Sequence, residues 1–197
     1  TIGSPFYMSP EQAQGLRELD HRADVWSVAA IAYECLTGTL PFRGRTGPQI
    51  LLAILGHEPE PPSIVGAQLG VPSTVDDVMA DGLAKDQNTR IGTLGELADR
   101  FGAAYGLVGG HGSWLSIPES ELAAQVEQGL RSMGEPSPAA MSLPPPRAPA
   151  EPSLPSAPFD EDDFVMGVPQ GPPLGLLAGI AAAVVLVLAV AAYLLLW

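Results

Sequence analysis

Few side chains in this sequence have the types and the spacing that metal or redox chemistry requires. Cys35 is the single cysteine, so the sequence allows no internal disulfide and no multi-cysteine metal site. The three histidines, His21, His57 and His111, are far apart and lack metal-ligand spacing. Residues 3–12, GSPFYMSPEQ, instead place polar side chains and two aromatic rings among turn-forming residues. The functional residues are therefore sought in this segment and in the elements that position it.

The charge balance argues against a protein that binds nucleic acid. The 197-residue chain carries a formal net charge of −13, and acidic groups outnumber basic ones on both sides of residue 133. A nucleic-acid partner requires a basic surface that displaces counterions from phosphates. Apolar residues make up 46% of the chain but are unevenly spread, which indicates segments of different kinds.

Residues 1–101 alternate helical patterns with short polar turns. The most apolar candidate helix is 25–36, in which ten of twelve residues are apolar, so we expect it to be enclosed by other protein. It is too short to span a bilayer, which takes roughly 20 residues. Asp24 lies at its predicted N-terminus, and Thr37-Gly38 is a typical end. Because Cys35 lies inside this helix, we predict a buried thiol.

Further helices are predicted at residues 48–55, 74–83 and 94–101. The last two each carry one apolar stripe, formed by Val75, Val78, Met79 and Leu83 and by Leu94, Leu97, Ala98 and Phe101. Ser116 and Glu119 have the spacing of a capping box and predict a helix that runs to about residue 133. Residues 102–133 thus form a predicted helical extension.

Three segments, in order, resemble eukaryotic-type protein kinases. GSPFYMSPEQ (residues 3–12) resembles the end of the activation segment, including its A-P-E element, here Ser9-Pro10-Glu11. Residues 20–42 resemble the D-x-W-S-x-G segment and the large central helix of the C-lobe, with Ala29 where glycine is common. Residues 83–97 resemble the late L-x-K-D-P-x-x-R segment, with Gln87 in place of proline. The SPEQ form and residues 57–63, HEPEPPS, are most similar to bacterial serine/threonine kinases.

The resemblance implies a role for each matching residue. Gly3, Ser4, Pro5 and Tyr7 would form the loop that receives the protein substrate, with the Ser4 hydroxyl directed at the catalytic aspartate. Ordinary turn polarity is the alternative for Ser4. Thr1 is either an activating phosphorylation site or ordinary loop polarity.

The resemblance also implies structural roles farther along the chain. Glu11 would pair with Arg90 in a buried bidentate ion pair, the alternative being two unrelated surface charges. Asp24 would accept hydrogen bonds from the backbone of the catalytic loop, and Trp26 would pack under Pro10.

Phosphoryl transfer requires elements that these 197 residues do not contain. Kinases use a glycine-rich loop, a strand lysine paired with a helix glutamate, catalytic-loop Asp and Asn residues, and the metal-binding Asp of D-F-G. All of them precede the activation segment in kinase order. The resemblance therefore implies a C-lobe fragment that is inactive alone, with ATP and Mg²⁺ bound by the intact protein and not by this part.

The remaining sequence divides into two segments. Residues 134–173 contain 12 of the 21 prolines and predict a disordered, hydrated spacer. Within it, residues 159–164, FDEDDF, are either a docking motif or a solvated acidic patch. Residues 174–197 carry no charge, and a helix of that length, about 36 Å, would cross a bilayer core of roughly 30 Å. A buried core helix is the alternative.

The sequence thus predicts a mainly α protein with four parts. These are the helical C-lobe portion of a protein kinase-like fold (1–101), a helical extension (102–133), a disordered Pro-rich linker (134–173) and one transmembrane helix (174–197). The expected function is membrane-anchored serine/threonine kinase activity in the intact protein, with protein substrates, single-pass membrane attachment and a cytoplasmic kinase portion. A pseudokinase or tail-anchored scaffold without catalysis is the other function class.

Overall fold

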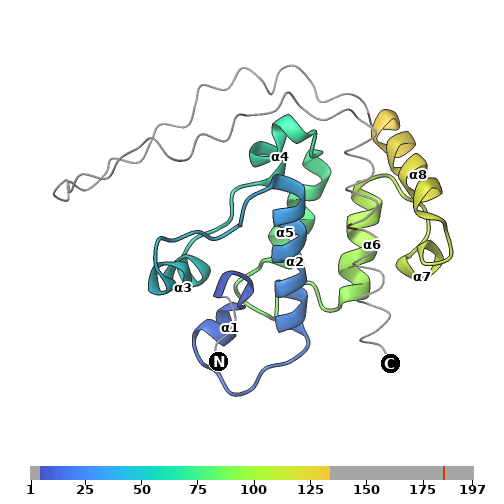
Figure 1. Cartoon of the computed structure of the whole chain (residues 1–197). Coiled ribbons are helices and arrows are strands. Elements are labelled where there is room, and N and C mark those ends of the chain that lie inside the picture. Colours follow the sequence, from blue (N-terminus) through green and yellow to red (C-terminus); the bar gives the residue numbers. More distant parts are fainter. Residues whose placement is uncertain (1–4, 134–183, 185–197) are drawn as a thin grey trace.

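The computed structural model describes residues 5–133 and residue 184, and every element within them is helical (Figure 1). The prediction of a mainly α chain is therefore confirmed for this part. Residues 1–4, the predicted linker and all of the predicted transmembrane helix except Val184 lie outside the described residues. In chain order the elements are η1 (Pro5–Tyr7), α1 (Pro10–Ala13), α2 (Arg22–Thr37), α3 (Gly47–Gly56), α4 (Pro62–Val65), η2 (Ala67–Leu69), η3 (Ser73–Val75), α5 (Asp76–Gly82), α6 (Leu94–Ala104), α7 (His111–Trp114) and α8 (Glu119–Ser132).

Helix α2 is the central element, as the sequence predicts. It contacts α4, α5, α6 and η1, and the side chains of Trp26 and Ala29 are fully buried. The helix ends at Gly38, whose φ of 69° is left-handed and whose N–H donates to the Glu34 carbonyl oxygen at 2.8 Å. At its other end the helix begins three residues earlier than predicted, so Asp24 lies within the first turn.

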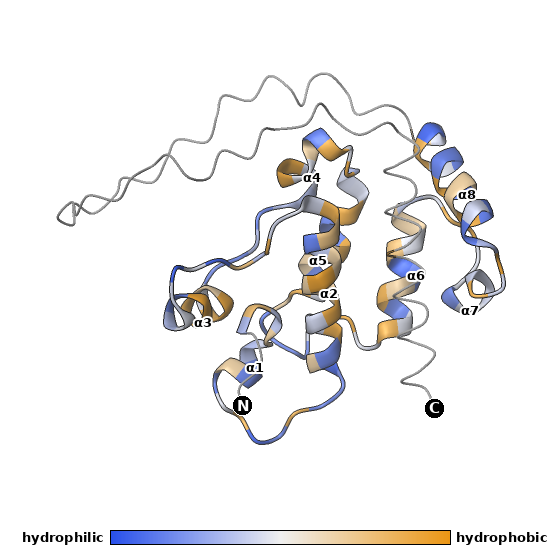
Figure 2. Cartoon of the chain, viewed as in Figure 1, coloured by the Kyte–Doolittle hydropathy of each residue, from blue (hydrophilic) through white to orange (hydrophobic). Residues whose placement is uncertain are grey.

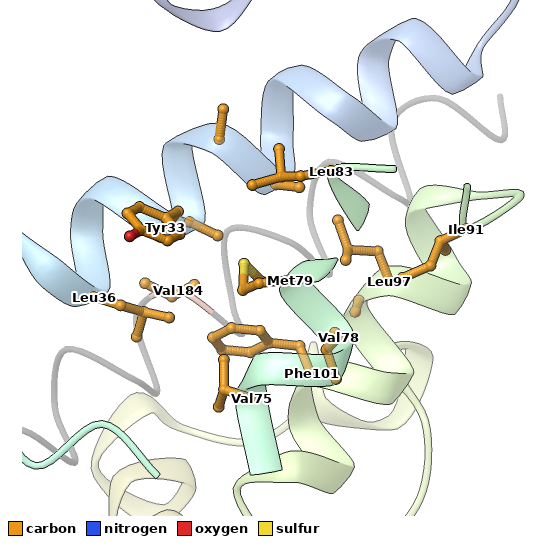
Figure 3. Packing of buried hydrophobic residues seen from close by; sticks show 14 of the residues in the cluster. Tyr33, Leu36, Val75, Val78, Met79, Leu83, Ile91, Leu97, Phe101 and Val184 are labelled. Atoms are coloured by element: carbon orange, nitrogen blue, oxygen red, sulfur yellow. The ribbon is translucent and has the colours of Figure 1, made fainter. Parts of the chain in front are cut away.

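The two predicted apolar stripes both face the core, where they meet α2 (Figure 3). The helix predicted at residues 74–83 is split into two elements. Residues 73–75 form the 3-10 helix η3, and α5 begins at Asp76. All eight predicted stripe residues are buried, each with no more than 6% of its surface exposed: Val75, Val78, Met79, Leu83, Leu94, Leu97, Ala98 and Phe101.

A close approach between α2 and α5 explains why alanine is accommodated at position 29. A Cβ atom placed on Gly82 of α5 would lie 3.0 Å from the Cβ of Ala29. The glycine therefore leaves the space that the alanine methyl group fills. The departure from the kinase pattern at Ala29 is matched by a small residue on the facing helix.

One side of α2 is exposed in this chain, which corrects the prediction of a buried thiol at Cys35. Cys35 is exposed rather than buried, and Ile31 is 43% exposed, so α2 is not enclosed on all sides. Asp24 is exposed and Val28 partly buried, and the four residues recur at helical spacing as one stripe. The sequence could not reveal this, because a helix that is apolar on every side carries no signal for which side is covered.

The predicted capping box at Ser116 does not form. Helix α8 begins after Pro118, whose side chain caps nothing, while Ser116 and Ile117 donate their N–H groups to the preceding α7 turn. The α7 turn therefore holds the Ser116 backbone, and the spacing of Ser116 and Glu119 in the sequence cannot predict this contact. The helix itself ends at Ser132, close to the predicted position.

Residues 102–133 pack on the same core as the helices before them. Helix α6 continues to Ala104, so residue 101 lies inside it. Trp114, Leu122 and Val126 are fully buried. On α8, a Cβ atom at Gly129 would lie 2.2 Å from the Tyr105 carbonyl oxygen. The helix therefore approaches the backbone at Tyr105, just after α6, as closely as glycine permits.

Replacement of Gly102 by alanine is expected to destabilise this packing. Its Cβ atom would lie 2.1 Å from the fully buried ring of Trp114, so the ring has to move. Overpacking of this kind costs about 1–3 kcal/mol, which outweighs the roughly 1 kcal/mol by which alanine favours a helix over glycine. Gly112→Ala is the matched control, because nothing lies within 4 Å of its Cβ position. Equal unfolding midpoints in denaturant for the two variants would contradict the packing argument.

No helix within the described residues is long and apolar enough to span a membrane. Val184, the one described residue beyond 133, is 7% exposed and belongs to the core cluster shown in Figure 3.

Candidate functional site

The segment that ends the predicted activation region is fixed to the helical body by a buried ion pair. Arg90 donates from Nη1 to Glu11 Oε1 at 2.7 Å and from Nη2 to Glu11 Oε2 at 3.0 Å. Both side chains are almost fully buried, although 79 residues separate them in the chain. The predicted bidentate geometry is therefore present, and the alternative of two unrelated surface charges does not apply.

Arg90 also joins this pair to the surrounding backbone. Its Nη1 donates to the carbonyl oxygen of Arg22 at 2.7 Å, and its Nε donates to that of Ala84 at 3.0 Å. Burial alone would raise the pKa of Glu11, but the hydrogen bonds from Arg90, the backbone and Ser9, with the attraction of the Arg90 charge, together outweigh burial, so the pKa lies below its ordinary value. The carboxylate thus stays ionised, and one guanidinium connects three segments of the chain.

Glu11 is presented by a short helix with its own cap. The Ser9 hydroxyl accepts from the Gln12 N–H at 3.4 Å, and the Gln12 side chain accepts from the Ser9 N–H at 2.9 Å. This is a capping box with proline at the first helical position, which suits the fixed φ of Pro10. Ser9 and Pro10 are buried, so the whole S-P-E turn lies against the body.

Two side chains of α2 hold Tyr7, and sequence reasoning missed both. The Tyr7 hydroxyl donates to Glu34 Oε2 at 2.6 Å, and the Ser27 hydroxyl donates to the Tyr7 carbonyl oxygen at 2.8 Å. The hydrogen bond to Glu34 raises the pKa of the Tyr7 phenol. Ser27 and Glu34 are seven residues apart, so they share one face of the helix, which is the only signal that the sequence offered.

Trp26 lies in an aromatic and cationic cluster. Its ring stacks on Phe42 with centroids 5.3 Å apart, and Arg90 Cζ lies 5.1 Å from its centroid. Lys85 Nζ lies 3.8 Å from the Phe42 centroid and 5.0 Å from that of Trp26, which is cation–π geometry. The predicted packing of Trp26 under Pro10 stays a prediction.

The other predicted site residues are distributed as follows. Thr1, Gly3 and Ser4 lie outside the described residues. Pro5 opens the 3-10 turn that leads to Tyr7. Asp24 is exposed, with its carboxylate on the open stripe of α2. In the part of the chain that the structure describes, no group of His, Cys, Asp or Glu side chains has the arrangement of a metal site.

The pH dependence of stability is expected to contain a contribution from Lys85. Burial lowers the pKa of its ammonium group to about 8 in the folded state, from 10.5. Between these values the unfolded state binds the extra proton, so this group makes stability rise with pH. The stability of Lys85→Met relative to the parent protein should thus be greatest at or below pH 8 and decline up to pH 10.5. Denaturant unfolding of both proteins across this range measures the difference, and a constant difference would contradict the prediction.

Comparison with known proteins yields one family and several relatives. The family described as "Protein kinase domain" matches residues 1–101. The chain is 31% identical over 158 residues to the serine/threonine-protein kinase PknH of Mycobacterium tuberculosis, a match that covers 80% of this chain and 23% of that protein. It is 37% identical over 95 residues to the probable serine/threonine-protein kinase PknB of Bifidobacterium longum, covering 48% and 13%.

A third relative shows a shorter but closer match. The chain is 46% identical over 61 residues to the serine/threonine-protein kinase pkn3 of Myxococcus xanthus, covering 31% of this chain and 11% of that protein. The chain thus spans about a quarter or less of the length of these relatives. The family match covers slightly more than half of the chain, including the Glu11–Arg90 pair and helix α2, and on this basis the chain belongs to the protein kinase family.

Proposed function

We propose that the chain is part of a membrane-anchored serine/threonine kinase that transfers the γ-phosphate of ATP to Ser or Thr side chains of proteins. The observation that carries this proposal is the buried Glu11–Arg90 pair. It holds the S-P-E turn on the helical body, which supports the resemblance of this turn to the end of a kinase activation segment. The three relatives are named as serine/threonine-protein kinases, which supports the same activity.

In this proposal the described residues hold the substrate rather than the phosphate donor. Gly3, Ser4 and Pro5 receive the substrate chain, and Tyr7 is fixed by its hydrogen bond to Glu34. The Ser4 hydroxyl orients the catalytic aspartate of the intact protein. Thr1 is a candidate activating phosphorylation site, because a phosphate there would add negative charge to the same segment.

The elements that bind ATP and Mg²⁺ are supplied by the rest of the intact protein, since their motifs are missing from these 197 residues. The exposed residues Asp24, Ile31 and Cys35 of α2 form a suitable surface for them. Its apolar members would be covered by the catalytic-loop region, and the Asp24 carboxylate would accept hydrogen bonds from the loop backbone. The chain therefore lacks catalytic residues of its own.

Residues 174–197 are proposed to anchor the protein in the membrane by a single span, with the kinase portion in the cytoplasm, where ATP is available. Twenty-four residues without a charge support a span, and Tyr193 and Trp197 suit the membrane interface. One observation favours an alternative: Val184 is buried in the core cluster, as expected if the apolar segment packs on the helical domain instead.

The second candidate function is a pseudokinase or scaffold. Incubation of the intact protein with ATP, Mg²⁺ and a protein substrate separates the two. Transfer of phosphate to Ser or Thr, strongly reduced in Ser4→Ala and retained in Ser4→Thr, is expected for the kinase, because threonine preserves the hydroxyl. Absence of transfer by an intact, folded protein that carries the upstream motifs would overturn the catalytic proposal.

A further inference from the structure

An open groove lies between helix α3 and the loop that precedes it. Its volume is about 620 Å³. Figure 1 shows α3 set apart from the bundle of α2, α5 and α6, and Figure 2 shows a largely hydrophobic helix beside a hydrophilic loop. The side chains that form the groove are Arg43, Arg45, Gln49, Leu52, Ala53 and His57.

The two arginines of the groove have no acidic partner among the described residues. Arg43 Nε donates to the Leu40 carbonyl oxygen at 3.2 Å, and the backbone N–H of Arg45 donates to Gln49 Oε1 at 2.8 Å. No ion pair between either guanidinium and a carboxylate of residues 5–133 is found. In a chain with a net charge of −13, two arginines that lack an acidic partner among residues 5–133 make the charge at this groove locally positive.

The loop that carries these arginines is fixed against the helix. A Cβ atom on Gly44 would lie 2.7 Å from the backbone nitrogen of Ile50 and 2.8 Å from the carbonyl carbon of Gln49. Only glycine permits this approach of the loop to the first turn of α3. Arg43 and Arg45 flank Gly44 in the sequence, so this close contact constrains the backbone that carries both guanidinium groups.

The groove also exposes apolar surface. Leu52 is 66% exposed and lies beside Ala53. A ligand that suits both features carries carboxylates for the arginines and an apolar side chain for Leu52. The longest acidic run of the sequence has this composition: residues 159–164, FDEDDF, contain four consecutive carboxylates between two phenylalanines.

We propose that the FDEDDF segment of the same chain binds in this α3 groove, with its carboxylates on Arg43 and Arg45 and a phenylalanine on Leu52. Exposed ion pairs are individually weak, so the contact depends on the high effective concentration that results when segment and groove belong to one chain. Residues 134–158 separate the segment from the end of the helical domain. A flexible chain of this length spans about 28 Å on average, and proline extends it. A domain of the described size has a radius of gyration of about 14 Å, so the groove is within reach.

Photocrosslinking in the intact protein tests this contact, which does not depend on phosphoryl transfer. With p-benzoylphenylalanine in place of Phe164, irradiation is expected to link the segment to residues 43–57 of the same chain, as mapped by mass spectrometry. Arg43→Glu combined with Arg45→Glu should lower the cross-link yield about tenfold or more, because attraction becomes repulsion. Arg17→Glu combined with Arg131→Glu makes the same change of charge at exposed sites outside the groove and should leave the yield unchanged.

Charge reversal gives the second arm. Replacing residues 160–163 by lysine should restore the cross-link in the Arg43→Glu, Arg45→Glu protein and abolish it in the parent. Unfolding midpoints should stay the same for the groove and segment variants, whereas the control that contains Arg131→Glu should have a slightly lower midpoint, because it breaks the exposed Glu127–Arg131 pair. Leu52→Asp, at an exposed position, replaces the arginine variant if that protein does not fold. The proposal would be overturned if the cross-link yield were the same in the groove variants as in the parent, or if the cross-links mapped elsewhere on the domain. Cross-links between two isotopically distinct chains would also overturn it, because they would show that a second copy occupies the groove.

Discussion

Glu11→Ala or Arg90→Ala in the intact protein is expected to lower the free energy of unfolding by about 3–5 kcal/mol, because each leaves one buried charge without its partner. The two side chains lie in one bidentate contact with almost no exposed surface. The double variant should cost less than the sum of the single variants, since it strands neither charge. Kinase activity should fall with stability, because the pair fixes the S-P-E turn.

Denaturant unfolding of the four proteins measures this coupling. The matched control is the pair Glu127–Arg131 on α8, which has the same charges at 2.6 Å but is exposed. Its single variants should lose no more than about 1 kcal/mol. The buried pair should also lose its contribution in acid. Because the pKa of Glu11 is held below its ordinary value, this stabilisation declines as the pH falls below the ordinary pKa and is lost once the pH has fallen through the lowered one. Strict additivity would show that Glu11 and Arg90 are not coupled.

Lysine at Val185 and at Leu188 is expected to weaken membrane insertion by roughly 5 kcal/mol or more if the two effects add, at about 2.5–3.5 kcal/mol for each mid-span charge. The parent protein should stay with membranes after carbonate or high-salt washing, whereas truncation at Gly171 should release it to the soluble fraction. Fractionation followed by immunoblotting of the intact protein and its variants measures this. Ala140→Lys combined with Ser142→Lys adds the same charge outside residues 174–197 and should leave attachment unchanged.

The same experiment distinguishes the membrane span from its alternative. If the apolar segment packs on the helical domain, as the burial of Val184 suggests, the parent protein would wash off membranes and Val185→Lys would lower its unfolding midpoint. Orientation has its own measurement. Protease added outside sealed cells should leave the kinase portion intact, and its digestion would contradict a cytoplasmic location.

The sequence alone predicted the helical class, the central helix and the inward stripes of α5 and α6. These features follow from local periodicity, which the backbone geometry of a helix dictates. The kinase pattern also predicted that Glu11 and Arg90 would meet. No periodicity contains that information, because 79 residues separate the two. The pattern succeeded because it records a tertiary contact as a pair of residue types in a fixed order.

Only the tertiary structure decided which surfaces of these helices are covered. Cys35 lies in an apolar helix and is nevertheless exposed, as is Ile31 one turn before it. Glu34 and Ser27 hold Tyr7 through contacts that form only after η1 has packed on α2. Ser116 has the spacing of a cap but is held in the α7 turn. Local sequence determines an element and its apolar face, whereas burial and hydrogen-bond partners depend on distant segments that folding brings together.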